Sequence, residues 1–185
     1  MQNILITSPV VTPQAIERLI ALNGKIGQLR VVADNPDNVD ALASATKAAG
    51  KALDVLVDID PGIRRTGVAT PEAAVALAQR IAAAETLRFA GVQYYCGAQQ
   101  HIESFADRRA AIADRTDYLR RVIEALSRAG YAPEVVTGGG TGTHRIDAEL
   151  GVLTELQAGS YVFMDKQYND CDLDGGGGKP FETSL

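Results

Sequence analysis

LDVLVDIDPG, residues 53–62, is the stretch of sequence that decides the fold class. Five of its first seven residues are apolar, and the run ends at Pro61-Gly62. A short apolar run with so few polar interruptions indicates a strand buried on both faces, as strands of parallel sheets are. Parallel strands are joined by helical crossovers, so helices are expected on both sides of this segment.

On either side, short apolar segments alternate with longer segments of helical periodicity. Thr12-Pro13 and Thr70-Pro71 each pair an N-cap residue with a proline at the first helical position. Gly50 and Gly130 follow the ends of helical patterns, where a helix commonly stops. We expect helices over about 13–22, from Asn38 or Asp40 to Ala49, from Pro71 onward and over 104–129, between six strands at 4–7, 29–33, 53–60, 89–95, 133–137 and 159–164.

Repeated strand–helix units predict an α/β fold with a parallel sheet. An open doubly wound sheet and a closed (β/α) barrel both fit this pattern. A complete barrel has about eight strands, so the six expected here would form an open sheet or part of a barrel. The length of 185 residues suits one domain.

Composition narrows the function classes. The net charge is −5 and the basic residues are scattered, which argues against nucleic-acid binding. No apolar run has the length of a membrane span, and the N-terminus lacks a signal-peptide pattern. The expected compartment is the cytoplasm, and the two cysteines, Cys96 and Cys171, are expected to be reduced thiols.

Polar residues and glycines gather where the expected strands end. In α/β proteins the carboxyl ends of the strands carry the working residues. These segments are 58–67 after the third strand, 93–101 after the fourth, 137–144 after the fifth, and Gly159-Ser160-Tyr161 at the sixth. The amino ends of the strands lack such residues, so the active site is predicted at the carboxyl ends of the strands.

The glycine-rich segment 138–142 is the most informative of these ends. Glycines let a backbone approach a ligand and expose its N–H groups, and Thr141 and Thr143 add hydroxyl donors. Phosphate sites recur after the last two strands of barrels, where Gly159-Ser160 is a second donor-rich segment. The two segments together predict a phosphate site, with a flexible strand-to-helix turn as the alternative. Neither a P-loop nor a dinucleotide fingerprint is present.

Single side chains at these ends leave alternatives open. His101 could act as a general base or be a hydrogen-bonded surface histidine. Arg65, beside Arg64, could hold a cofactor ring or form a solvent salt bridge, and Tyr95 could donate to a substrate or pack. No spacing of His, Cys, Asp and Glu completes a metal site.

Four of these stretches, taken together and in this order, resemble one enzyme family. It comprises the D-threonine aldolase and D-serine dehydratase-like enzymes, which are fold-type III pyridoxal 5'-phosphate (PLP) enzymes with a barrel domain related to alanine racemase. The resemblance covers nearly the whole chain. The matching stretches are VDIDPGIRRTGV (57–68), GVQYYCGAQQH (91–101), VVTGGGTGTH (135–144) and ELQAGSYVFMDKQY (155–168).

The resemblance implies a partial (β/α)8 barrel over residues 1–168, about six of eight units, and a loop over 169–185 that leads to a C-terminal β-domain. It places Tyr95 and His101 on the substrate side, where His101 would help to remove the proton of the substrate's β-hydroxyl. It places Arg65 against the PLP ring. The implied contacts with the phosphate and its surroundings are Thr141, Gly142, Gly159, Ser160 and Tyr161.

The implied reaction is retro-aldol cleavage of a D-3-hydroxy amino acid, such as D-threonine or D-3-hydroxyaspartate, to glycine and an aldehyde or keto acid. One alternative is a D-serine dehydratase-type ammonia-lyase, and another is a non-catalytic PLP-binding protein. A third is an inactive domain that pairs with another chain. The expected partner is a small D-amino acid, without nucleic acid or membrane, and a homodimer is an expected assembly.

The sequence departs from the family in two ways. The family's Schiff-base lysine lies in a basic, His-containing motif, and none of the lysines here does. Full-length relatives also use a divalent metal whose ligands lie in the C-terminal domain, and those ligands are missing here. We therefore expect a truncated family member that does not catalyse the reaction on its own. The lysines are Lys25, Lys47, Lys51, Lys166 and Lys179.

Overall fold

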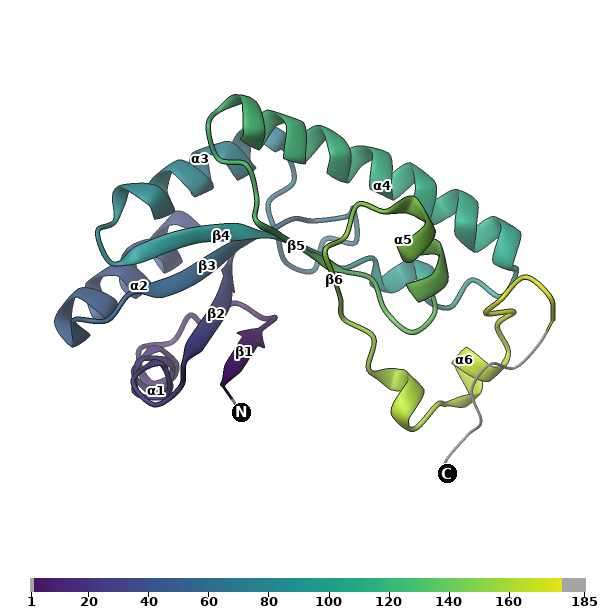
Figure 1. Cartoon of the computed structure of the whole chain (residues 1–185), viewed down its shortest axis with the longest axis horizontal. Coiled ribbons are helices and arrows are strands. Elements are labelled where there is room, and N and C mark those ends of the chain that lie inside the picture. The colour runs from purple at the N-terminus through teal and green to yellow at the C-terminus, as the bar shows by residue number, and fades with distance from the viewer. Residues whose placement is uncertain (1, 178–185) are drawn as a thin grey trace. The chain divides into compact units, whose positions relative to one another are not determined.

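A computed structural model describes residues 2–177 and shows an α/β partial barrel, as predicted (Figure 1). Six strands form one sheet in chain order, β1-β2-β3-β4-β5-β6, and they pair in parallel. The strands are β1 (Asn3–Ile6), β2 (Gln28–Ala33), β3 (Leu53–Asp58), β4 (Leu87–Tyr94), β5 (Val135–Gly138) and β6 (Glu155–Leu156).

Helices connect these strands. Within residues 2–177 no helix is both long enough and apolar enough to cross a membrane. The α-helices are α1 (Pro13–Asn23), α2 (Pro36–Ala49), α3 (Pro71–Ala83), α4 (Phe105–Arg128), α5 (His144–Leu150) and α6 (Lys166–Asn169), and the 3-10 helices are η1 (Gly97–Gln99) and η2 (Ser160–Val162).

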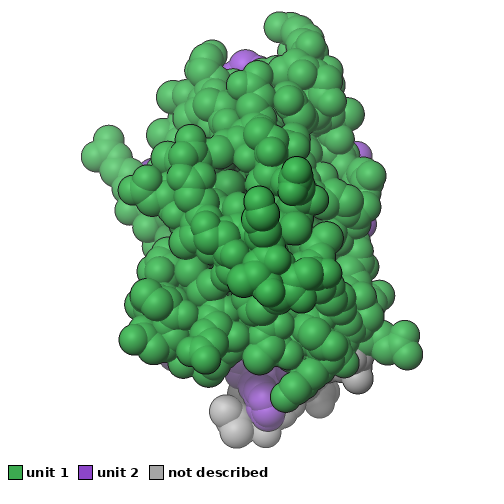
Figure 2. Space-filling model, turned by 90° about the vertical axis from the view of Figure 1, so that its left-hand side faces the viewer, with its two compact units in different colours: residues 1–60, 64–93, 122–135 green, residues 61–63, 94–121, 136–185 purple. Residues whose placement is uncertain are grey.

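The chain divides into two compact units, drawn green and purple in Figure 2. Of the described residues, unit 1 takes 2–60, 64–93 and 122–135. Unit 2 takes 61–63, 94–121 and 136–177. Unit 1 therefore holds β1 to β3 and most of β4, whereas unit 2 holds most of the segments that follow β4 and β5.

The first three helices begin with the same device. Thr12, Asn35 and Thr70 each accept a backbone N–H with their side chain, and each is followed by proline at the first helical position. This placement satisfies one of the N–H groups that a helix leaves without a partner at its start. The start predicted for α2 was wrong: Asn38 instead donates to the carbonyl of Val10 at 2.7 Å.

An apolar cluster in unit 1 joins side chains of neighbouring strands. Val32, Leu56 and Ala90 are buried there, and Leu5 and Val135 pack against them. These five residues come from β1, β2, β3, β4 and β5, one from each. The prediction that β3 is buried on both faces is confirmed, because every residue of β3 except Asp54 is buried, and successive residues of a strand point to opposite faces.

A β-bulge interrupts the pairing of β3 with β4. Val55 pairs with Phe89, but the next residue, Leu56, pairs with Gly91, so Ala90 is the additional residue. Gly91 has φ +147°, and a Cβ at this position would lie 1.9 Å from the carbonyl oxygen of Val135. Only glycine permits two strand backbones to approach so closely.

A buried arginine organises part of unit 2. The guanidinium of Arg108 donates to the carbonyl oxygens of Ile102, Glu103 and Asp172. Its side chain is fully buried, and burial lowers its pKa. Nearby, an apolar cluster consists of Met164, Tyr168, Cys171 and Leu173.

One prediction about the last third of the chain was wrong, and one helix was not predicted. The sixth strand is Glu155–Leu156, and the segment predicted as that strand, 159–164, contains the 3-10 helix η2 instead. Tyr161 and Phe163 are 46% and 63% exposed, so this apolar run is not a buried strand. The helix α5 follows the glycine-rich segment and was not predicted. Residues 178–185 of the predicted loop 169–185 lie outside the described residues.

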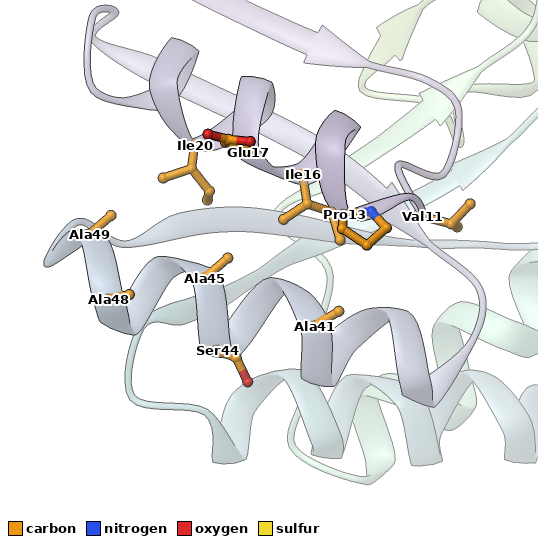
Figure 3. A pocket seen from close by; sticks show the side chains of 10 residues that line it. All are labelled: Val11, Pro13, Ile16, Glu17, Ile20, Ala41, Ser44, Ala45, Ala48 and Ala49. Carbon is orange, nitrogen blue, oxygen red and sulfur yellow. The ribbon is translucent and has the colours of Figure 1, made fainter.

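An apolar groove runs between α1 and α2 in unit 1 (Figure 3). Its volume is about 670 Å³, and Ile16 and Ile20 of α1 face four alanines of α2 across it. Glu17 and Ser44 are the polar side chains of its lining. None of the residues predicted to form the active site lines this groove, so the candidate site lies elsewhere, at the strand ends.

Candidate active site

Unit 2 contains every predicted site residue except Arg65. Tyr95 follows the end of β4, His101 follows η1, and Thr141-Gly142 follow β5. Gly159, Ser160 and Tyr161 follow β6 and open η2. All of these residues lie on the carboxyl side of their strands, which is the side that carries the working residues in α/β proteins.

A hydrogen bond joins the two predicted phosphate-binding segments. The backbone N–H of Tyr161 donates to Oγ1 of Thr141 at 3.1 Å. Four residues before Tyr161, the N–H of Gln157 donates to the carbonyl of Gly138 at 2.8 Å. The chain after β6 therefore runs back along the glycine-rich segment, and residues 141 and 159–161 lie side by side.

Several donors at this junction have no acceptor within residues 2–177. They are the hydroxyl hydrogen of Thr141 and the backbone N–H groups of Gly159 and Ser160. Thr141 is buried, and the space beside the α-carbon of Gly159 is open, because a Cβ placed there would meet no heavy atom within 4 Å. A phosphate offers only acceptor oxygens, so this group of donors fits a phosphate.

The glycines of the loop 138–143 have a different explanation from the one predicted. The sequence suggested that a ligand approaches these glycines, but protein atoms fill the space. A Cβ on Gly140 would lie 2.5 Å from Oε1 of Gln100, and one on Gly142 would lie 2.1 Å from the Gln100 carbonyl oxygen. At Gly139, with φ +67°, a Cβ would lie 2.4 Å from Oδ2 of Asp147.

Gln100, Thr143 and Asp147 form a buried polar network behind this loop. Oε1 of Gln100 accepts the N–H of Gly142 at 3.0 Å, and Nε2 of Gln100 donates to Oγ1 of Thr143 at 3.0 Å. The Thr143 hydroxyl donates to Oδ2 of Asp147 at 2.6 Å. Burial raises the pKa of Asp147, against the hydrogen bond from Thr143.

His101 stacks against Tyr168, a residue that the sequence did not single out. The ring centroids lie 4.5 Å apart at an interplanar angle of 53°. Burial raises the pKa of Tyr168, and the side chain of Ser160 opposes this rise. Tyr168 thus lies between a predicted catalytic residue and a predicted phosphate ligand. Tyr168 is the last residue of the fourth family-like stretch, 155–168, and its place in that stretch could have identified it from the sequence.

Tyr95 and the two cysteines complete this part of unit 2. The half-buried Tyr95 ring packs over Gly97, where a Cβ would lie 2.9 Å from its Cε1 atom. Cys96 and Cys171 are free thiols, as predicted. Burial raises the pKa of Cys96 to about 12, so its thiolate is scarce at neutral pH and Cys96 is a poor nucleophile.

Arg65 lies in unit 1, where polar side chains gather beyond the ends of β2, β3 and β4. Gln93 donates to the carboxylate of Asp58 at 3.0 Å, and Asp34 accepts the backbone N–H of Gly67 at 2.9 Å. Burial raises the pKa of Asp58, whereas hydrogen bonds from Thr66 and Gln93 and the charge of Arg65 oppose this rise. Arg65 is therefore among the charges that favour the ionised form of Asp58.

The shift at Asp58 predicts a pH-dependent effect of Asp58→Asn. Because the folded pKa lies above the ordinary value of 3.8, the folded protein binds more protons than the unfolded chain between these two values. The contribution of Asp58 to stability therefore falls as the pH rises through this window. We expect Asp58→Asn to gain stability over the wild type as the pH increases from 4 to 7, measured by urea unfolding.

Asp54 on the same strand is the matched control. There, burial is outweighed by hydrogen bonds from Arg88 and Gln28, so the pKa is lowered. Its contribution to stability is present above the unfolded pKa and is lost as the pH falls. Asp54→Asn should therefore keep a nearly constant stability difference from the wild type between pH 4 and 7, because the window for Asp54 lies below its unfolded pKa of 3.8. Equal trends in the two variants would contradict the prediction.

Among the described residues, no three His, Cys, Asp or Glu side chains lie close enough together to hold a metal ion. The described lysines stand away from the carboxyl ends of the strands. Lys25 and Lys51 precede β2 and β3, whereas Lys47 and Lys166 lie in helices. Lys179 lies outside the described residues.

Comparison with known proteins gives consistent matches. Residues 1–167 match the family described as alanine racemase, N-terminal domain. The chain is 40% identical over 168 residues to a 3-hydroxy-D-aspartate aldolase of Paracoccus denitrificans (strain Pd 1222), which covers 91% of this chain and 43% of that protein. It is 28% identical over 155 residues to a D-threo-3-hydroxyaspartate dehydratase of Delftia sp. (strain HT23), covering 83% of this chain and 40% of that protein.

A solved structure shows the same likeness. The crystal structure of D-threonine aldolase from Filomicrobium marinum superposes with a TM-score of 0.93 at 38% sequence identity. The match covers 98% of this chain and 49% of that one. The chain therefore spans about half the length of the relatives it matches.

Proposed function

This chain belongs to the family of the alanine racemase N-terminal domain, and from that premise we propose that it serves a PLP-dependent lyase. Members of the family are PLP-dependent aldolases and lyases. The proposed reaction is retro-aldol cleavage of a D-3-hydroxy amino acid, such as D-threonine or D-3-hydroxyaspartate, to glycine and an aldehyde or keto acid. The proposed compartment is the cytoplasm, and the proposed assembly is a homodimer.

The observation that carries this proposal is the hydrogen bond between Tyr161 and Thr141. It brings together two segments that are far apart in sequence and that both present donors without acceptors in the described chain. We propose that the Thr141 hydroxyl and the N–H groups of Gly159 and Ser160 hold the PLP phosphate. The N–H of Gly142 is already bonded to Gln100, so Gly142 is not proposed as a donor to the phosphate; its missing side chain leaves room for Gln100.

The remaining roles follow the family resemblance. When bound, PLP supplies an electron sink for the electrons of the breaking Cα–Cβ bond. His101, whose imidazole is held against Tyr168, is proposed to accept the proton of the substrate's β-hydroxyl. Tyr95 is proposed to line the substrate side, and Arg65 to contact the cofactor ring. The resemblance also implies a divalent metal, and we propose that its ligands come from residues other than 2–177 of this chain.

A dehydratase is the second candidate, because a relative at 28% identity is a D-threo-3-hydroxyaspartate dehydratase. The aldolase relative is more similar, at 40% identity, which favours the retro-aldol reaction. The products separate the two reactions: an aldolase releases glycine, whereas a dehydratase releases ammonia. A non-catalytic PLP-binding protein would release neither and would still bind the cofactor.

Cofactor binding tests the phosphate site. We expect the purified chain to bind PLP more tightly than pyridoxal, which lacks the phosphate, in equilibrium dialysis. Thr141→Val removes one hydrogen bond to a charged group, and a loss of about 1.5 kcal/mol corresponds to about tenfold weaker PLP binding. The matched control is Thr116→Val, which changes a buried threonine on α4 and should leave PLP binding unchanged.

The comparison with pyridoxal shows whether the site recognises phosphate. Equal affinity of the wild-type chain for PLP and pyridoxal would contradict the proposed phosphate site. Because no described lysine lies at a strand's carboxyl end, we expect the isolated chain to bind PLP without a covalent bond. Incubation with D-threonine should then release no glycine, and clear turnover would contradict this expectation.

A further inference from the structure

Gln100 is a fully buried amide with every hydrogen-bonding group in use. Its Oε1 accepts the N–H of Gly142 at 3.0 Å. Its Nε2 donates to Oγ1 of Thr143 at 3.0 Å and to the carbonyl of Cys96 at 3.4 Å. The backbone N–H of Gly142 can only donate, so it must face the amide oxygen. The two amide hydrogens then donate to Oγ1 of Thr143 and to the carbonyl of Cys96, and the orientation of the amide is fixed.

The same counting fixes the direction of the bonds beyond Gln100. Oγ1 of Thr143 accepts from Gln100 and from the N–H of Gly140, at 3.2 Å. Both acceptor positions of this hydroxyl are then occupied, so its hydrogen points to the carboxylate of Asp147. The bonds run in one direction from the Gly142 backbone, through Gln100 and Thr143, to a buried carboxylate. Networks of this kind hold a unique arrangement when every member is satisfied.

Gln100 also determines which side of the loop is open. Its carbonyl and side-chain oxygens occupy the space beside Gly142 and Gly140, so a ligand cannot approach the loop from that side. Thr141, between these glycines, makes its contact with the chain after β6 instead.

We infer that Gln100 is a positioning residue that sets the shape of the loop 138–143 and so holds the Thr141 hydroxyl toward the chain after β6. The part of this inference that concerns a ligand rests on the proposed function, whereas the part that concerns the loop does not. Without the Gln100 amide, the loop loses its fixed shape, and the Thr141 hydroxyl is no longer held beside Gly159 and Ser160.

The first arm of the experiment needs no ligand. Amide hydrogen exchange is measured by NMR on the full chain, on Gln100→Met, on Gln100→Asn and on the control Gln99→Met. Gln99 is the adjacent glutamine, and its Oε1 accepts no hydrogen bond from the described residues. We expect the exchange of Gly140 and Gly142 to accelerate by about tenfold or more in Gln100→Met and to stay unchanged in Gln99→Met.

Gln100→Asn keeps the test decisive if the methionine variant does not fold. Asparagine keeps a neutral amide at this buried position, but its side chain is one methylene shorter and cannot reach both the N–H of Gly142 and Oγ1 of Thr143. At least one of the Gly140 and Gly142 amides should therefore exchange faster. Wild-type protection of both amides in both Gln100 variants would overturn the inference.

The second arm uses inorganic phosphate and PLP as probes. Equilibrium dialysis gives the affinity for each, with pyridoxal as the probe that lacks the phosphate. We expect phosphate and PLP to bind about tenfold more weakly to Gln100→Met than to the wild type and to Gln99→Met, with the affinity for pyridoxal unchanged. Wild-type affinity for PLP in Gln100→Met would overturn the role of Gln100 in holding Thr141 in place.

Failure of the proposed function has a different outcome. In that case neither phosphate nor PLP would bind to the wild-type chain, while the exchange measurements would still distinguish Gln100→Met from Gln99→Met. Faster exchange in Gln100→Met would then support the role of Gln100 in shaping the loop. Unchanged exchange would overturn it, whether or not a ligand binds.

Discussion

Replacing Gly91 with alanine is expected to lower the free energy of unfolding by at least about 3 kcal/mol, the scale of a severe core disruption. The new Cβ would lie 1.9 Å from the carbonyl oxygen of Val135 and 2.9 Å from its backbone nitrogen. Backbone atoms of β5 cannot rotate away as a flexible side chain could. The φ of +147° adds strain for any residue with a side chain. Urea unfolding followed by circular dichroism measures the loss.

Gly50→Ala is the matched control for this prediction. Gly50 also has a positive φ, +67°, but no heavy atom lies within 4 Å of a Cβ placed there. This control isolates the backbone strain, which costs about 1–2 kcal/mol for one residue. If Gly91→Ala were as stable as Gly50→Ala, the close approach of β4 and β5 in unit 1 would not be a requirement of the fold.

Replacing Arg108 with alanine is expected to cost about 3 kcal/mol and to loosen the segment around α6. The backbone carbonyls of Ile102 and Asp172 would lose their donor, and a buried acceptor without a partner is unfavourable. The Glu103 carbonyl would lose one of its two donors, because it also accepts the N–H of Asp172. A cavity would also replace the large buried side chain. The loss should show in urea unfolding and in faster hydrogen exchange over residues 166–175.

Arg108→Met separates these contributions. Methionine fills much of the same volume and carries no charge. It therefore removes the cost of burying the guanidinium charge, a cost that is also the reason for the lowered pKa of Arg108. We expect its loss of stability to be smaller than that of Arg108→Ala, while exchange near Asp172 still accelerates. Equal exchange in all three proteins would show that Arg108 does not hold this segment.

The sequence predicted the elements whose residues act locally. The apolar run of β3 and the Thr-Pro starts of α1 and α3 are properties of a few adjacent residues, and the structure confirms them. The start of α2 was missed although Asn35-Pro36 is the same kind of cap. Asn38 and Asp40 are equally good capping residue types. Pro36 distinguishes Asn35 from them, because proline is favoured at the position that follows the cap.

The last third of the chain was harder to predict for a physical reason. Tyr161, Val162 and Phe163 form an apolar run that is typical of a strand, yet they are exposed in and beside η2. The strand β6 has only two residues, which is too short to leave a periodic pattern. The helix α5 has seven residues, most of them charged or histidine, and offers little apolar stripe.

The candidate site divides along similar lines. The family-like stretches directed attention to Thr141, Ser160 and His101, which unit 2 brings into one neighbourhood. Gln100 and Tyr168 lie inside the same stretches, but the sequence around them did not indicate a role. Gln100 acts through its contact with Thr143, 43 positions away, and Tyr168 through its contact with His101. Such contacts appear only once the chain has folded.

The order of the strands bears on how the polypeptide is made. β1 to β6 follow one another in the sheet as they do in the chain, so each strand pairs with one that has just left the ribosome. The sequence separation between paired strands is then about one helical crossover. This keeps the contact order low for a protein rich in parallel strands, which favours fast folding. The fold can therefore grow one strand–helix unit at a time during synthesis, from the amino end onward.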